Sequence, residues 1–267
     1  MAEKRVIFGY WRTRALGQPI RVMLAYMGVP FEDRQYQVGD PPTFDKSVWN
    51  EAKIALEREG LAFPNLPYLI DTDGTAVSQT RAILRYLARS RPEHSLLGKT
   101  DEEQTRADVM VEAVMDLWRE FFTMTYCSWI ELDAKKHVFY EKTLPVHMAR
   151  LEKQLQKFEW AAGPNLTYAD FFVHEALYQM REFKAESLAP FPAASAFISR
   201  FAALPGVAAY AESEAYVPYP FHNRYSNFAE WQDGRPLPAA TLGEGGAEGR
   251  PQLTGEKSYM RAVLYPA

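Results

Sequence analysis

The order of strand and helix signals in the first ninety residues limits the fold of this chain more than any other feature. Short strand-like runs occur at residues 6–8, 31–37, 68–70 and 75–77. A helical pattern that starts near Pro19 and ends at Gly28 separates the first two runs, and a second helical pattern follows Thr80. A turn with Gly74 joins the last two runs, which is typical of a hairpin. The order β-α-β, irregular segment, β-β-α predicts a small α/β domain.

The pattern changes to helices beyond this domain. Thr100 and Glu103 have the spacing of a capping box, and apolar residues at helical spacing follow them. Two further helices are predicted at residues 144–158 and after Thr167, and no strand signal of comparable strength occurs. The sequence therefore predicts an α/β domain over residues 1–91 and an all-helical domain over residues 98–231. The Gly- and Pro-rich stretch 232–267 is predicted to be an extended or flexible tail.

Composition excludes several classes of protein. The formal net charge is -4, so no large basic field predicts a nucleic-acid partner. Cys127 is the single cysteine, so an intrachain disulfide and a cysteine-based zinc site are both excluded. The five histidines show no metal-like cluster. No stretch approaches the ~18 apolar residues that would predict a membrane span. We therefore expect a cytoplasmic protein without a metal.

Several sequence blocks, taken together and in order, carry a family resemblance. They are Gly9-Tyr-Trp11, Gly17-Gln-Pro-Ile-Arg21, Phe63-Pro-Asn-Leu-Pro-Tyr-Leu-Ile-Asp71, Ser78-Gln-Thr-Arg-Ala-Ile-Leu-Arg-Tyr86, Arg106-Ala-Asp108, Val114-Met-Asp116 and Leu166-Thr-Tyr-Ala-Asp-Phe171. From about Val6 to about Trp231 the chain resembles the glutathione transferase family, and most closely its mu class. The resemblance implies a thioredoxin-like N-terminal domain with a mixed four-stranded sheet, followed by a C-terminal helical bundle.

The resemblance assigns the catalytic role to Tyr10, at the end of the first strand. A free thiol titrates at about 8.5, so only a few per cent of glutathione is thiolate at neutral pH. A phenol O–H that donates to the sulfur favours the charged form, and a drop of about two pKa units is worth roughly 2.7 kcal/mol. The alternative is that Tyr10 is a packing aromatic.

The resemblance also implies a set of glutathione contacts in the N-terminal domain. These are Trp11, Lys46, Trp49, Lys53, Asn65, Leu66, Pro67, Gln79 and Thr80. Pro67 matches a cis-proline, which would let the Leu66 main chain pair with the cysteinyl part of glutathione. Gln79 and Thr80 lie where a helix begins, which suits the γ-glutamyl carboxylate. The remaining tryptophans and lysines match positions around the glycyl carboxylate. The alternatives are an ordinary strand-start proline, simple helix capping and solvated lysines.

Two residues of the helical domain complete the implied site. Tyr126 matches a tyrosine that faces the electrophile, and Asp116 matches an aspartate that reaches the glutathione of the partner subunit. A surface carboxylate and a core phenol are the alternatives. Phe63 matches the family's dimer-anchoring aromatic, so we expect a homodimer. The aromatic stretch 221–231 either covers the electrophile pocket or packs on the core.

The predicted function is transfer of the glutathione thiolate to small apolar electrophiles, a detoxification reaction. Glutathione is the co-substrate, and no metal or organic cofactor is implied. Two alternatives stay open at this point. One is a glutathione-dependent isomerase such as a prostaglandin synthase, and the other is a non-catalytic member of the family that stores ligands or serves structurally.

Overall fold

The N-terminal half of this computed structural model is built on one mixed sheet of four strands. The structure describes residues 5–40, 43–228, 231–232 and 235–236. The strands are β1 (Val6–Trp11), β2 (Phe31–Tyr36), β3 (Tyr68–Ile70) and β4 (Ala76–Ser78), in the spatial order β2-β1-β3-β4. β1 pairs parallel with β2, while β3 pairs antiparallel with both β1 and β4. The sheet and its hairpin confirm the predicted fold.

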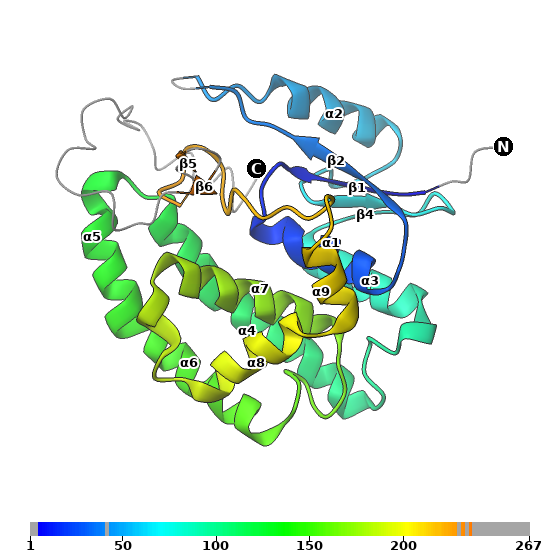
Figure 1. The fold of residues 1–267 in the computed structure, drawn as a ribbon. Helices are drawn as coiled ribbons and strands as arrows, with labels where there is room; N and C mark the ends of the chain where they lie inside the picture. The colour runs from blue at the N-terminus through cyan, green and yellow to red at the C-terminus, as the bar shows by residue number, and fades with distance from the viewer. Residues whose placement is uncertain (1–4, 41–42, 229–230, 233–234, 237–267) are drawn as a thin grey trace.

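Helices cover both faces of this sheet (Figure 1). α1 (Gln18–Tyr26) and α3 (Thr80–Ser90) lie between the sheet and the helical domain, and α2 (Ser47–Arg58) lies on the opposite face. The prediction of an irregular segment between β2 and the hairpin was therefore wrong. Only Trp49 and Leu56 of α2 are buried, one every two turns, and Ile54 is exposed. Such a narrow apolar stripe gives little helical periodicity to detect.

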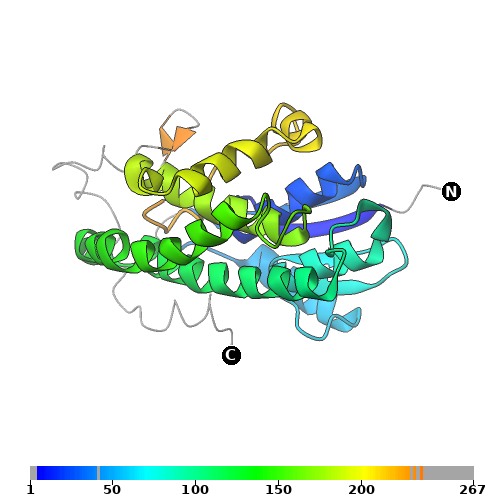
Figure 2. The same cartoon turned by 90° about the horizontal axis from the view of Figure 1, so that it is seen from below.

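The second half of the described chain is helical, as predicted. Its α-helices are α4 (Asp101–Thr125), α5 (Trp129–Val138), α6 (Leu144–Lys157), α7 (Tyr168–Phe183), α8 (Pro192–Ala202) and α9 (Pro205–Ala211), and a π-helical turn at Phe139–Thr143 joins α5 to α6. Thr100 caps α4 by accepting the Glu103 N–H at 3.2 Å. Thr167 and Asp170 form the capping box of α7. Figure 2 shows α4 as a long helix along the lower face of the molecule.

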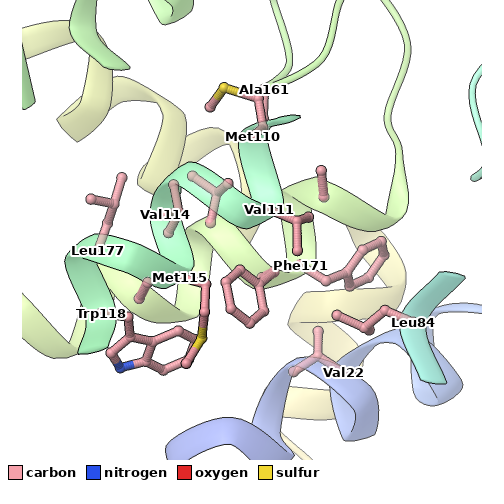
Figure 3. Close-up of a cluster of buried hydrophobic side chains, with 14 of the residues drawn as sticks. Val22, Leu84, Met110, Val111, Val114, Met115, Trp118, Ala161, Phe171 and Leu177 are labelled. Carbon is pink, nitrogen blue, oxygen red and sulfur yellow. The ribbon is translucent and has the colours of Figure 1, made fainter. Parts of the chain in front are cut away.

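One apolar core joins the two halves. Val22 of α1 and Leu84 of α3 belong to the same buried cluster as Met115 and Trp118 of α4 and Phe171 of α7 (Figure 3). Because the sheet domain rests on the helical domain through these side chains, the elements that carry the predicted site residues hold fixed relative positions. The division at residues 91 and 98 stays a prediction.

The described residues contain no helix that is long and apolar enough to cross a membrane. The predicted tail, residues 232–267, lies outside the described residues except for Gln232 and the strand β6 (Arg235–Pro236), which pairs with β5 (Trp231–Gln232).

Candidate functional site

Tyr10 lies at the carboxyl end of β1, beside the 3₁₀ turn Ala15–Gly17. Its side chain is only 5% exposed. A Cβ added at Gly17 would stand 2.3 Å from Cδ1 of the Tyr10 ring, so no residue with a side chain fits there without displacing the tyrosine. The Gly17-Gln-Pro block therefore holds the Tyr10 ring in place by close packing.

The surroundings of the Tyr10 hydroxyl keep it protonated and hold its oxygen in place. Burial raises the pKa of the Tyr10 phenol above its ordinary value, and the Leu16 N–H and the Arg21 charge oppose this rise only in part. The Leu16 N–H donates to the Tyr10 oxygen at 3.2 Å. Among the described residues the Tyr10 hydroxyl donates no hydrogen bond, and its one bond is the one that its oxygen accepts from Leu16. The group is therefore a neutral hydrogen-bond donor at physiological pH.

Leu16 connects Tyr10 to the start of α3. Its N–H donates to Tyr10, and its carbonyl accepts the Thr80 hydroxyl proton at 3.0 Å. Thr80 is buried, and the residue before it, Gln79, is exposed and has φ of 75°. A non-glycine residue in this backbone region costs of order 1–3 kcal/mol and is often found at functional sites. Leu16 therefore forms hydrogen bonds both with Tyr10, the predicted thiol contact, and with Thr80, a predicted carboxylate contact.

The Leu66–Pro67 peptide bond is cis, as the sequence predicts. The Pro67 carbonyl accepts the Gln79 N–H at 3.2 Å, so this bond lies beside the start of α3. The Leu66 N–H, predicted to pair with glutathione, donates instead to Oδ1 of Asn65 at 2.9 Å. The Asn65 side chain must therefore rotate before that N–H can bind a ligand.

The predicted tryptophans lie together, but one of them is mainly a packing residue. The Trp11 and Trp49 rings meet edge to face at 6.4 Å. Trp49 is 8% exposed and stacks on Tyr68 in a small apolar cluster with Leu56 and Leu61.

The two lysines are separated. Lys46 occupies the N-cap position of α2, with its Nζ 5.3 Å from the Tyr225 ring centroid. Lys53 is half-exposed one and a half turns into the helix. The structure thus brings Lys46 towards the C-terminal segment and leaves Lys53 on the surface of α2.

Tyr126 forms the C-cap of α4 and faces the segment that follows α9. Its hydroxyl oxygen accepts the Asn223 N–H at 3.2 Å, and its ring stacks on His222 at 5.2 Å. Asp116, which was predicted to contact the glutathione of the partner subunit, is exposed on α4 and forms an ion pair with Arg119 at 2.9 Å. It lines a cavity of about 410 Å³ between α4 and α6, away from Tyr126.

A buried polar chain that the sequence analysis missed holds the C-terminal segment. The Arg14 guanidinium forms two hydrogen bonds with Glu175 of α7, at 2.6 and 2.9 Å. Glu175 accepts from Gln179 at 2.8 Å, and Gln179 Oε1 lies 3.0 Å from His222 Nε2. Because the Gln179 amide donates to Glu175, its oxygen faces His222, which must carry its proton on Nε2. In the sequence, the aromatic stretch around His222 was the only feature that drew attention to any part of this hydrogen-bond network.

The sequence left two interpretations of residues 221–231 open, namely that they pack on the core or that they cover the electrophile pocket. Phe221 and Phe228 are buried and stack on each other at 4.6 Å, so they pack on the core. Tyr225, between them, is half-buried and lies beside Tyr126. The described residues contain no group of three or more His, Cys, Asp or Glu side chains that could hold a metal ion.

Comparison with known proteins gives one consistent picture. The family model of the glutathione S-transferase N-terminal domain matches residues 7–89, and that of the C-terminal domain matches residues 102–214. Glutathione S-transferase Mu 1 of Mus musculus is 39% identical over 228 residues, which are 85% of this chain and 99% of the mouse protein. Glutathione S-transferase Mu 3 of Homo sapiens is 36% identical over 229 residues, 86% of this chain and 96% of the human one.

A solved structure agrees with these relatives. The crystal structure of the glutathione S-transferase Blo t 8 matches with a TM-score of 0.73 at 27% identity, covering 82% of this chain and 98% of that one. The sequence relatives and this structure therefore extend over both halves of the described fold.

Proposed function

Because this chain belongs to the glutathione transferase family and is most similar to its mu class, we propose that Tyr10 activates glutathione for conjugation to small apolar electrophiles. The activity itself follows from the relatives, which are mu-class transferases, and they do not favour the isomerase or storage alternatives. The residue roles below are proposals. We call Tyr10, Leu16, residues 66–67 and residues 79–80 the glutathione side, and Tyr126 with residues 220–228 the electrophile side.

The buried Tyr10 hydroxyl is the observation that supports this proposal most directly. It is a protonated donor whose oxygen is already held by the Leu16 N–H. A donor fixed in this way stabilises a thiolate without giving up its own proton, because the phenol is a much weaker acid than the thiol. Two units of thiol pKa correspond to about 2.7 kcal/mol, which makes the thiolate the main form of bound glutathione at neutral pH.

The N-terminus of α3 suits the γ-glutamyl carboxylate. Backbone N–H groups at a helix start carry partial positive charge and bind anions. Gln79 is exposed there, and the Thr80 oxygen can still accept a hydrogen bond although its proton goes to Leu16. Because Leu16 also holds Tyr10, a carboxylate bound at α3 would be placed in a fixed relation to the thiol. Lys46 would contribute positive charge for the glycyl carboxylate.

The chemical step is a nucleophilic substitution or addition by the thiolate. With a chloronitrobenzene, the sulfur forms a C–S bond to the ring carbon, negative charge moves onto the nitro groups, and chloride leaves as the C–Cl bond breaks. The thiol proton has already passed to solvent. Tyr126 lies half-buried at the end of α4, and we propose that it stabilises the anion that develops on the electrophile. Glutathione is the co-substrate, and we propose that no further cofactor takes part.

Two surface features support a homodimer. Phe63 is 78% exposed on the strand-free stretch before β3. The cavity between α4 and α6 is lined by apolar side chains that include Met110, Val114 and Leu151. An aromatic ring from a second copy would fill this cavity, and Asp116 at its edge would then lie near the partner's site. Sedimentation equilibrium over a range of protein concentrations tests the dimer, and cell fractionation tests the proposed cytoplasmic location.

The Tyr10→Phe variant tests the role of Tyr10. We expect kcat/KM for 1-chloro-2,4-dinitrobenzene to fall about 100-fold and the pKa of bound glutathione, followed by thiolate absorbance in the ultraviolet, to rise to about 8.5. Tyr26→Phe, which removes a phenol hydroxyl at the end of α1, is the matched control and should behave as wild type. Equal turnover by Tyr10→Phe and wild type would reject this role, and no turnover by wild type would favour ligand storage.

A further inference from the structure

A groove of about 460 Å³ lies between the C-terminal end of α4, the helix α5 and the π-helical turn that follows α5. Met124 of α4 and Phe139 of the π-helical turn form its buried part. Among the described residues, the groove shares no lining residue with the cavity between α4 and α6 or with either side of the proposed site. It is therefore a separate apolar surface of the helical domain.

The helix α5 directs apolar side chains into this groove. Ile130, Ala134 and Val138 line it at intervals of four residues, which places them on one face of the helix. All three are exposed, Ile130 by 68% and Val138 by 47%. The exposed face of a surface helix is ordinarily polar, and a contiguous apolar patch marks an interaction site. This face of α5 therefore has the character of a surface that another segment covers.

The charged residues that line the groove are mainly acidic. Glu120 of α4 and Glu131 of α5 lie there with one base, Lys135, whose Nζ is 3.7 Å from the Glu131 carboxylate. Two carboxylates and one ammonium group leave an excess of negative charge. An apolar segment that carries basic residues and no acidic ones is complementary to such a groove.

The stretch 257–267 of this chain has that composition, and it lies outside the described residues. It contains the basic residues Lys257 and Arg261 and no acidic residue. Met260 and Leu264 are four residues apart, the interval at which two side chains share one face of a helix. The large apolar residues of the stretch are Tyr259, Met260, Val263, Leu264 and Tyr265.

The described chain passes close to the groove shortly before this stretch. The Asn227 N–H donates to the carbonyl of Thr125, the last residue of α4, at 2.7 Å, and Nδ2 of Asn227 donates to the Cys127 carbonyl at 2.9 Å. About twenty residues separate Pro236, the last described residue, from Lys257, and an extended chain spans roughly 3.3 Å per residue. This reach far exceeds the length of α5, which is about 15 Å.

We propose that residues 257–265 occupy the groove between α4 and α5 of their own chain. Their apolar side chains cover the apolar face of α5, and Lys257 and Arg261 face the two glutamates of the lining. Tethering favours this occupant over a separate molecule, because a linker that spans the distance gives an effective concentration of order 1 mM. The inference does not depend on the proposed function, since neither side of the proposed site lines the groove.

Amide hydrogen exchange of the full chain tests the proposal from the segment. Leu264→Asp places a carboxylate on the apolar side of the segment, where it would face an acidic groove. We expect the exchange protection of α5 amides, averaged over residues 132–138, to fall about tenfold while that of α7 stays unchanged. Leu253→Asp makes the same change outside the segment and should behave as wild type.

A variant of the groove tests the proposal from the other side. Ile130→Lys introduces a positive charge at an exposed position, so it should repel the basic segment without disturbing the fold. Trypsin cleaves after Lys257 and Arg261 only when the segment is released, and we expect both cleavages to be about tenfold faster in this variant than in wild type. Val48→Lys, which changes a 62% exposed residue of α2, is the matched control and should leave both rates unchanged.

The proposal requires both responses, and the absence of either one overturns it. Wild-type α5 exchange that slows as the protein concentration rises, with the same exchange in Leu264→Asp and Leu253→Asp, would also overturn it. That result would show that a second copy of the chain covers the groove instead.

Discussion

The two sides of the site are built in different ways. On the glutathione side, Tyr10 is held by Leu16, six residues away, and the contacts lie within one small domain. On the electrophile side, Arg14 pairs with Glu175 across 161 residues, and Asn223 reaches Tyr126 across 97 residues. In the proposed site, the thiol chemistry thus depends on a local motif, whereas the electrophile contacts depend on how distant segments pack. The second side can therefore change without altering the first.

The largest effect is expected from the buried ion pair that anchors the electrophile side. Arg14 and Glu175 are both 2% exposed, so Glu175→Gln leaves a buried guanidinium without a compensating charge. Loss of one partner from such a pair costs about 3–5 kcal/mol. We expect this decrease in the free energy of unfolding, measured by urea denaturation. If the sides are independent, the pKa of bound glutathione should not move.

Glu32→Gln provides the control for that measurement. Glu32 pairs with Arg34 on the surface of β2, where both side chains are about half-exposed, so its removal should cost less than about 1 kcal/mol. A higher pKa of bound glutathione in Glu175→Gln than in wild type would contradict the independence of the two sides. It would show that the loss of Glu175 affects Tyr10 through Arg14.

The same difference explains what the sequence could predict. The sheet, its hairpin, the cis bond at Pro67 and the capping box of Thr167 follow from short motifs whose residues lie close together in the chain. Helix α2 was missed because its buried stripe holds only Trp49 and Leu56.

Most of the electrophile side could not be predicted at all. No spacing in the sequence relates Arg14 to Glu175, or His222 to Gln179, because these contacts exist only once α7 has packed against the turn after β1. Tyr126 was predicted from the family resemblance, while the residues that contact it in the structure were not.

A smaller effect should come from the glutathione side when Gly17 is changed to Ala. The new Cβ would stand 2.3 Å from the Tyr10 ring, and overpacking of this kind costs about 1–3 kcal/mol. Because the displaced ring moves the hydroxyl, we also expect the pKa of bound glutathione to rise, as measured by ultraviolet titration.

Gly28→Ala separates these two consequences. Gly28 has φ of 66° and no neighbour near its Cβ position, so this variant is destabilised by backbone strain alone, by about 1 kcal/mol. The pKa of bound glutathione should therefore stay at its wild-type value in Gly28→Ala. If it also stays unchanged in Gly17→Ala, close packing around Tyr10 does not determine the position of the hydroxyl.

The smallest effect concerns pH and acts on the electrophile side. Burial lowers the pKa of His222 to about 3, well below the value of about 6.5 in the unfolded chain. Below pH 6.5 the unfolded chain therefore binds more protons at this site than the folded chain does, and the free energy of unfolding falls as pH falls. One such histidine contributes a loss of about 1 kcal/mol between pH 7 and pH 5.5.

His222→Gln tests this assignment, because an amide cannot titrate and can still donate to Gln179. The variant should have a lower free energy of unfolding than wild type at pH 7. Between pH 5.5 and pH 7 this free energy, measured by urea denaturation, should also depend less steeply on pH, because one fewer site binds a proton on unfolding. Burial also lowers the pKa of His174 to about 3, so His174→Gln should reduce the slope by a similar amount. Only the His222 variant should also change kcat/KM for 1-chloro-2,4-dinitrobenzene, since of the two histidines only His222 stacks on Tyr126. The same kcat/KM in both variants would mean that the C-terminal segment keeps Tyr126 in place without His222.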